Sequence, residues 1–286
     1  MKVLVIGSSV CDVIINIQRL PQQGEDENII SQSLQIGGCA FNVASMLRYF
    51  HIPFDLFSPI GQGIYGEFVK KQLRNESIPI MIETSQNNGC CYCLVDQSGE
   101  RTFICEHGGE YSYQKEWFEK LDPMNYQYVY ICGLEIEEET GSYIINFLEQ
   151  NPHFQIIFAP SPRINHISKE KMNRLLSLSP ILHLNEKEIL EYTNKLTIEE
   201  AAKELYLQTK NIIIVTLGKK GCYYYDHKHH YFDSQKTQVV DTIGAGDSHI
   251  GTIIAMLYQN QPLDKCMKKA NDIASQVVSQ KGARLK

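Results

Sequence analysis

Short apolar runs that end in glycine recur along this chain of 286 residues, and they alternate with segments of helical periodicity. The runs "KVLVIG" (2–7) and "NIIIVTLG" (211–218) are typical of buried strands, and "FDLFSPIG" (54–61) predicts another strand stopped by glycine. Residues 39–50, ahead of the second run, carry apolar side chains at helical spacing. Strands that alternate with helices predict an α/β fold whose parallel sheet is covered by helices on both faces.

Two β-rich segments, at approximately residues 12–35 and 80–110, interrupt this alternation. We expect them to form a small inserted subdomain, because they do not fit the strand–helix pattern around them. The chain has no internal repeat, low-complexity tract or flexible linker, so we expect a single domain over residues 1–286. Two helices are predicted at its end, over residues 246–259 and 263–280.

Charge and composition argue against several classes of protein. The net charge of −6 and the absence of a Lys/Arg run predict no nucleic-acid partner and no membrane surface partner. Nine cysteines are an odd number, spread along a long chain, so they do not indicate a disulfide framework. The opening "MKVLVIG" lacks the features of a signal peptide, and no apolar segment reaches the ~18 residues of a membrane span. We therefore expect a cytoplasmic protein.

The stretch "VVDTIGAGDSHIG" (239–251) places two glycines and an aspartate where an apolar helix begins. The first amides of a helix lack internal partners and favour negative charge, so this turn could bind a phosphate oxygen. Asp247 would repel a bound phosphate, but it is well placed to accept a proton from a hydroxyl that attacks the phosphate. The alternative is that Asp247 only caps the helix. On these residues alone, both readings stay open.

The residues around this turn resemble the C-terminal signature of the ribokinase-like (PfkB-type) carbohydrate kinases, Asp-Thr-x-Gly-Ala-Gly-Asp, which falls on residues 241–247. Other stretches resemble further motifs of that family, in the family's order: "GSSVCDVI" (7–14), "GGCAFNVA" (37–44), "GQGIYGEFV" (61–69), "DQSGERTF" (96–103), "LNEKE" (184–188) and "TLGKKG" (216–221). The resemblance covers nearly the whole chain. It implies a three-layer α/β/α domain with a small β-sheet lid.

The resemblance also implies which residues form the site. The catalytic set would be Asp247 as general base, with Gly244, Ala245 and Gly246 as an anion hole. The substrate would be held by Asp12, Gly37, Gly38 and Asn42. Arg101 on the lid would either contact the substrate or form a surface salt bridge. The nucleotide side would consist of Asn185, Thr216, Gly218, Gly221, Thr242 and Asn271, and Glu188 would hold Mg²⁺ through water. ATP, Mg²⁺ and a monovalent cation such as K⁺ are the implied cofactors.

The chain departs from the family pattern at several places. The stretch "APSPR" (159–163) keeps only Arg163 of a common Asp-x-Asn-x-Arg motif. Val10 stands where ribose-specific members carry asparagine, and Cys39-Ala40 stands where they carry Lys-Gly. Ribose is therefore disfavoured as the substrate. His249 occupies a position that is usually apolar, and the sequence offers no explanation for it.

The function expected from these motifs is ATP-dependent phosphorylation of a hydroxymethyl group on a sugar or a sugar-like substrate. A nucleoside kinase is the alternative, and a non-catalytic sugar-binding protein is a third reading. The lid segments carry apolar residues on one face of their strands: Cys91, Cys93, Val95, Phe103 and Cys105. Because a small sheet must cover its apolar faces, we expect a homodimer joined through the lids.

Overall fold

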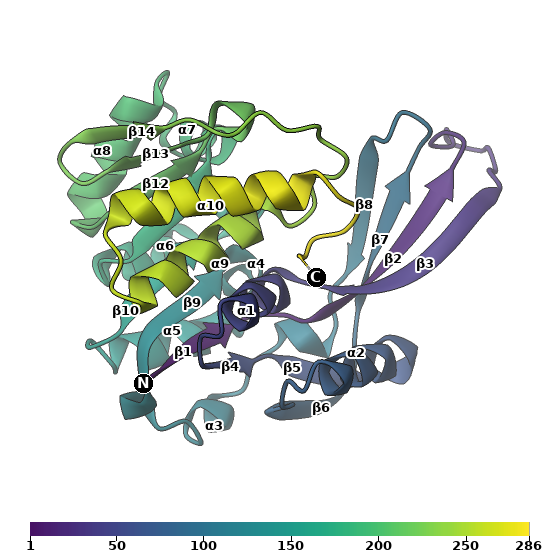
Figure 1. Cartoon of the computed structure of the whole chain (residues 1–286). Helices are drawn as coiled ribbons and strands as arrows, with labels where there is room; N and C mark the ends of the chain where they lie inside the picture. The colour runs from purple at the N-terminus through teal and green to yellow at the C-terminus, as the bar shows by residue number, and fades with distance from the viewer. Residues whose placement is uncertain (286) are drawn as a thin grey trace.

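A computed structural model describes residues 1–285 and has an eight-stranded sheet at its centre (Figure 1). The sheet order is β14-β13-β12-β11-β10-β9-β1-β4. Six strands are parallel: β1 (Lys2–Ile6), β4 (Phe54–Phe57), β9 (Tyr126–Cys132), β10 (Gln155–Ala159), β11 (Ile181–Asn185) and β12 (Ile213–Thr216). The hairpin of β13 (Cys222–Tyr225) and β14 (His229–Phe232) adds an antiparallel edge. The predicted mostly parallel sheet is confirmed.

Helices cover both faces of this sheet because neighbouring strand residues point to opposite sides. Val3 and Val5 contribute to one buried cluster, together with residues of α1 (Cys39–Tyr49), α9 (Ala245–Tyr258) and α10 (Leu263–Val278). Leu4 and Ile6 contribute to the other, with α5 (Gly141–Glu149), α6 (Lys169–Ser177) and α8 (Ile198–Thr209). The three-layer fold class is thus confirmed. The helices predicted at 246–259 and 263–280 are α9 and α10.

The two β-rich segments supply a separate four-stranded sheet in the order β3-β2-β7-β8. Its strands are β2 (Val10–Ile17), β3 (Ile29–Gly37), β7 (Cys90–Val95) and β8 (Arg101–Glu106). We call this sheet the lid; it extends to one side of the main domain, with its edge strand β8 nearest to that domain (Figure 1). Helix α2 (Gly63–Asn75) packs against β2, and the Tyr65 and Tyr92 hydroxyls are hydrogen-bonded at 2.9 Å.

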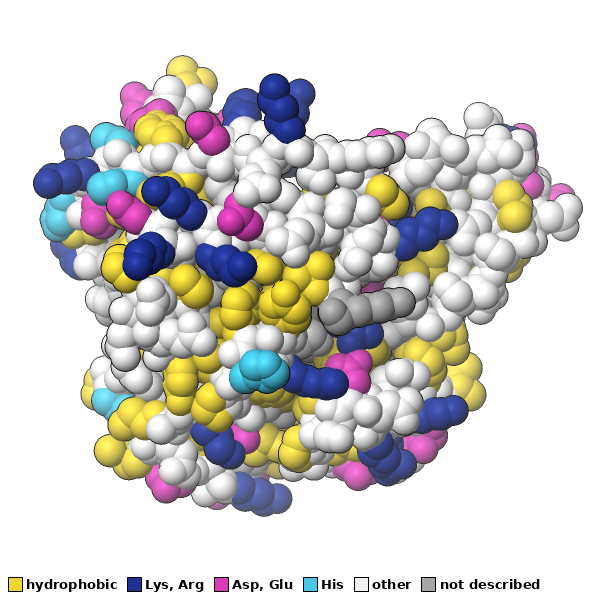
Figure 2. Space-filling view, in the orientation of Figure 1, with side chains coloured by type: hydrophobic (Ala, Val, Ile, Leu, Met, Phe, Trp, Pro, Cys, Tyr) yellow, Lys and Arg dark blue, Asp and Glu magenta, His cyan; other side chains and the backbone are white. Residues whose placement is uncertain are grey.

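The remaining strands and α-helices are short. They are β5 (Pro59–Gln62), β6 (Ile82–Asn87), α3 (Lys115–Phe118), α4 (Gly133–Glu137) and α7 (Glu186–Thr193). On the face drawn in Figure 2, Lys and Arg side chains are interspersed with Asp and Glu. Within residues 1–285, no helix combines the length and the apolar character that a membrane span requires.

Candidate active site

A sharp turn between residues 241 and 245 leads into α9. Gly244 has a φ of 71°, a left-handed conformation that glycine adopts without strain. A Cβ at Gly244 would lie 2.5 Å from the Cβ of Ala283, so the C-terminal segment also requires glycine here. The Ala245 amide donates to the Thr242 carbonyl at 3.3 Å. The amides of Gly244, Gly246 and Asp247 have no backbone partner among the described residues, and a Cβ added at Gly246 would meet open space.

Asp247 lies in the first turn of α9, where Asn42 of α1 meets it. The Asn42 Nδ2 donates to the Asp247 Oδ2 at 2.8 Å. Burial raises the pKa of Asp247 to about 6, hydrogen bonds from Asn42 and Cys39 oppose that rise, and the charge of Glu135 adds to it. A carboxylate with a pKa near 6 is largely ionised at neutral pH and still basic enough to take a proton.

Asp12 lies on β2 beside the glycine pair at the end of β3. A Cβ at Gly37 would lie 2.0 Å from the Asp12 Oδ2, so only glycine leaves room for this carboxylate. Burial, together with charge repulsion from Cys105 and Asp247, raises the pKa of Asp12 to about 7. The structure therefore brings Asp12, Gly37, Asn42 and Asp247 together from four separate elements.

Two cavities lie on opposite sides of the turn before α9. The larger, about 590 Å³, is lined by five of the six residues predicted for the nucleotide side, Thr216, Gly218, Gly221, Thr242 and Asn271, and by Gly246 of the predicted anion hole. The sixth, Asn185, is not among its lining residues. The smaller, about 350 Å³, lies beneath the lid and is lined by Asp12, Gln35, Arg101, Asp241 and Ile243, among others. We call them the nucleotide pocket and the acceptor pocket. Successive residues of one turn thus face two different pockets.

Comparison of the chain with known protein families identifies the family to which it belongs. The family model "pfkB family carbohydrate kinase" matches residues 1–286. The chain belongs to that family. This confirms the resemblance found in the sequence, and it makes the protein a kinase of the class that acts on sugars or nucleosides.

The relatives of this pfkB kinase include proteins named sugar kinases and proteins named nucleoside kinases. It is 31% identical to "Uncharacterized sugar kinase YegV" of Escherichia coli K12, over 98% of this chain and 89% of the relative. It is 27% identical to a nucleoside kinase of Thermoplasma acidophilum, over 93% of this chain and 86% of the relative. The structure of Arabidopsis thaliana ribokinase complexed with ribose and ATP has the same fold, with a TM-score of 0.82 at 21% identity; the match covers 99% of this chain and 94% of that one.

Asn185 and Glu188 of the kinase form a reciprocal capping box at the start of α7. The Glu188 amide donates to the Asn185 Oδ1 at 2.8 Å, and the Glu188 carboxylate accepts from the Asn185 backbone and side-chain amides at 2.9 and 2.7 Å. Within residues 1–285, no group of three His, Cys, Asp or Glu side chains could hold a metal ion. This donor set fits Mg²⁺ only through water, as the sequence predicted, and the metal role stays a prediction.

Asn271 joins α10 to the end of β14. Its Nδ2 donates to the carbonyls of Phe232 and Asp233, at 3.1 and 3.2 Å. The side chain therefore fixes one wall of the nucleotide pocket. Contact between Asn271 and a nucleotide stays a prediction.

Arg101 reaches out of the lid to the turn before α9. Its Nη1 lies 2.8 Å from the Asp241 Oδ1. Of the two roles that the sequence left open, the salt bridge is formed, although it lies inside the acceptor pocket and not on the open surface.

His249, which the sequence left unexplained, extends from α9 toward β11. Its Nδ1 lies 3.0 Å from the Nε2 of His183, and both rings are buried. Burial lowers the pKa of His249 to about 4, so the ring is neutral at physiological pH. The usual apolar side chain is thus replaced by a neutral imidazole that lines the nucleotide pocket and pairs with His183.

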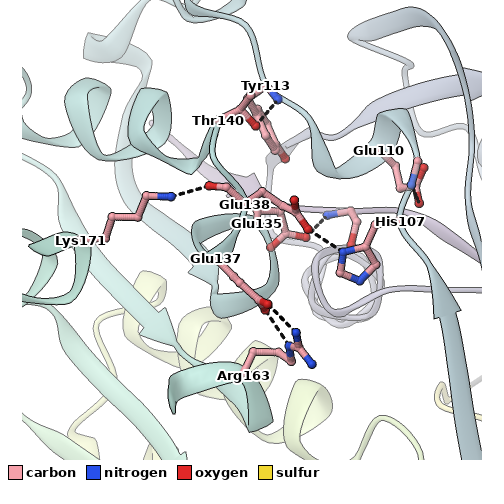
Figure 3. A network of polar contacts seen from close by, with 11 residues as sticks. His107, Glu110, Tyr113, Glu135, Glu137, Glu138, Thr140, Arg163 and Lys171 are labelled. Carbon is pink, nitrogen blue, oxygen red and sulfur yellow. Dashed lines mark hydrogen bonds and ion pairs between the residues drawn. The ribbon is translucent and has the colours of Figure 1, made fainter. Parts of the chain in front are cut away.

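Glu135 is a residue near the site that the sequence analysis missed. It lies on α4, is fully buried, and accepts from the Ser8 amide at 2.7 Å through Oε1, while Oε2 has no hydrogen-bond partner among the described residues. Figure 3 shows it beside a network in which Arg163 pairs with Glu137, at 2.6 Å through Nε, and Lys171 donates to the Glu138 carbonyl. The retained arginine of "APSPR" therefore binds a neighbouring glutamate. A glutamate within a buried apolar stretch was the only sequence signal for Glu135.

Proposed function

We propose that this kinase transfers the γ-phosphoryl group of ATP to a hydroxymethyl group of a sugar or sugar-like acceptor. The observation that carries the proposal is the turn before α9, whose residues line two pockets on opposite sides. Gly246 lines the nucleotide pocket, and Asp247 follows it directly in the chain. Asp12, whose pKa is raised by the charge of Asp247, lines the acceptor pocket. We infer that the phosphoryl group passes between the two pockets beside Asp247.

Each part of the turn has a role in the proposed reaction. The acceptor hydroxyl gives its proton to Asp247 as it attacks the phosphorus, and the bond to the leaving ADP oxygen breaks. The first-turn amides from Gly246 onward stabilise charge on the phosphoryl oxygens; losing one such donor typically costs ~3 kcal/mol of barrier. Asp12 and the unpartnered Oδ1 of Asn42 accept hydrogen bonds from other hydroxyls of the acceptor.

The family resemblance implies two cations, Mg²⁺ and K⁺, and candidate ligands can be named only for Mg²⁺. Mg²⁺ neutralises phosphate charge when bound, and Asn185 and Glu188 would hold it through water. Burial raises the pKa of Glu188, so a cation bound nearby would favour the ionised form of this carboxylate. A K⁺ requirement stays a prediction of the resemblance.

A nucleoside acceptor is the second candidate, and one observation favours it. Ile14 and Val95 line the acceptor pocket on the inner face of the lid, beside Asp12. An apolar strip in that place could pack against a base while Asp12 binds the ribose. The Thermoplasma relative is named a nucleoside kinase.

The test is ADP formation from MgATP over a panel of sugars and nucleosides, with Asp247→Asn as the matched control. We expect rapid ADP release with acceptors that carry a free hydroxymethyl group, and ³¹P NMR should place the phosphate on that group. Turnover only with nucleosides would establish the second candidate. Equal rates in the Asp247→Asn control, or no acceptor-dependent turnover in the panel, would contradict the proposal.

A further inference from the structure

The edge strand of the lid, β8, is tied to the main domain at both of its ends. Beyond its last residue, the His107 Nδ1 lies 2.6 Å from the Glu138 Oε1 (Figure 3). The His107 ring also stacks on Tyr111, with 3.9 Å between the ring centroids. Glu110 accepts from the amides of Gly89 and Gly108, at 2.8 and 3.1 Å. These contacts fix the base of the lid, where the chain returns to the main domain.

The first residue of β8, Arg101, makes the contact at the other end. It follows the turn that joins β7 to β8, which places it toward the tip of the lid. Its side chain is 21% exposed and its partner Asp241 is 5% exposed, with 2.8 Å between Nη1 and Oδ1. Water screens a pair this buried much less than a surface ion pair, and loss of one partner leaves the other charge poorly compensated.

Asp241 uses the same carboxylate to hold two backbone segments. Its Oδ1 also accepts from the Ile243 amide at 2.8 Å, and its Oδ2 accepts from the Gly282 amide at 2.9 Å. Burial alone would raise the pKa of Asp241, but Arg101 and these two amides hold it below its ordinary value. Since Ala283 packs against Gly244, the C-terminal segment in turn supports the entry to α9.

One carboxylate therefore joins the lid, the turn that separates the two pockets, and the C-terminal segment. We propose that Arg101 is a positioning residue: its ion pair with Asp241 latches the closed lid onto the turn before α9, so that closure over the acceptor also sets the geometry of the anion hole. This inference rests on the proposed function, because it assigns a task to the turn within phosphoryl transfer. It does not require Arg101 to touch the acceptor.

The first test needs no acceptor. Hydrogen–deuterium exchange is compared for the wild-type protein, Arg101→Ala and Arg19→Ala. Arg19 is a matched control because it belongs to the lid and pairs with Glu25, at 2.6 Å, outside the acceptor pocket. We expect Arg101→Ala to speed exchange at least threefold, both in the lid hairpin (residues 90–106) and in the turn (residues 239–246). Arg19→Ala should change neither segment.

The second test uses the acceptor that the panel identifies. Arg101→Ala should lower kcat for transfer about tenfold or more and raise the ratio of ATP hydrolysed to acceptor phosphorylated, since an open lid admits water as a competing acceptor. Arg101→Lys should keep part of the activity because it keeps the charge. Guanidinium at a non-denaturing concentration should restore transfer in Arg101→Ala and have no effect on Arg19→Ala.

Two outcomes would overturn the latch. One is unchanged exchange in the turn of Arg101→Ala, which would separate the lid from the anion hole. The other is a rise in acceptor KM alone, with kcat and the hydrolysis ratio unchanged, which would make Arg101 a direct contact for the acceptor. Because exchange is measured without substrate, failure of the latch and failure of the proposed kinase reaction give different results.

Discussion

The side-chain amide of Asn42 donates a 2.8 Å hydrogen bond to the carboxylate of Asp247, across 205 residues of the chain. The contact joins the first turns of α1 and α9, which follow two different glycine turns. It leaves the Asn42 Oδ1 without a partner among the described residues. The side-chain amide that would orient the acceptor is therefore hydrogen-bonded to the base that would deprotonate it.

Asp247→Asn should lower kcat by ~10² or more while the Kd values for ATP and acceptor stay nearly constant. The reason is that asparagine can still accept the hydrogen bond from Asn42 but cannot take up the proton. Steady-state kinetics with isothermal titration calorimetry provides the measurement. Wild-type turnover in this variant would mean that another group is the base.

The same substitution should change stability in a pH-dependent way. The folded-state pKa of Asp247 is about 6, above its ordinary value of 3.8. The folded protein therefore loses stability as the pH rises from 3.8 through 6, because the carboxylate must then be buried in its charged form. Asp247→Asn removes this cost. Its free energy of unfolding should match the wild type at pH 3.5 and exceed it at pH 8 by on the order of 1–3 kcal/mol. Urea denaturation at both pH values measures the difference, and equal stability at pH 8 would argue against a buried charge.

Transfer activity should fall as the pH drops from 7 to 5. Asp12 and Asp247 have pKa values raised to about 7 and about 6, and both would work in their ionised forms. Because the charge of Asp247 raises the pKa of Asp12, the two carboxylates should titrate as one coupled unit. In Asp12→Asn the acidic limb of the kcat profile should move to lower pH. A limb at the same pH in both proteins would show that the two carboxylates do not interact.

Asp12→Ala should raise the KM for the acceptor strongly and the KM for ATP little, because it removes charge-assisted hydrogen bonds to acceptor hydroxyls. Asp26→Ala is a suitable control, since Asp26 is an exposed carboxylate on the lid loop. Equal losses for both substrates would indicate instead that Asp12 maintains the fold.

A homodimer joined through the lids stays a prediction, and the register shows which face would form it. The pairs Cys91/Cys105 and Cys93/Phe103 lie on the same face as Asp12, so that apolar face covers the acceptor pocket. The outer face carries the row Leu34, Val13, Tyr92 and Ile104; α2 covers its middle, and Leu34 and Ile104 are 43% and 58% exposed.

Sedimentation at micromolar concentration should give twice the chain mass of 32.7 kDa. Ile104→Glu should shift the equilibrium toward the single chain, whereas Leu207→Glu, at an exposed position on α8, should not. A clean ~33 kDa species in the wild type would contradict the dimer.

The sequence by itself determined the layers and the centre of the site. Short apolar runs that end in glycine predict strands of a sheet, and their alternation with helices predicts that the sheet is parallel. The residues of the turn before α9 could be named because they match a family signature; the local sequence alone left Asp247 open between a base and a helix cap. Asp12 and Gly37 were named in the same way, and only the structure shows that the Asp12 carboxylate requires glycine at position 37.

Only the tertiary structure decided the long-range polar pairs. The contacts of Arg101 with Asp241, of His249 with His183, and of Glu135 with Ser8 each join elements that are distant in the chain. No local pattern encodes such a pair, because its two members have no fixed spacing in sequence. Their partners are chosen by which side chains the packed layers bring within hydrogen-bond distance, and by the high cost of leaving a buried polar group unpaired.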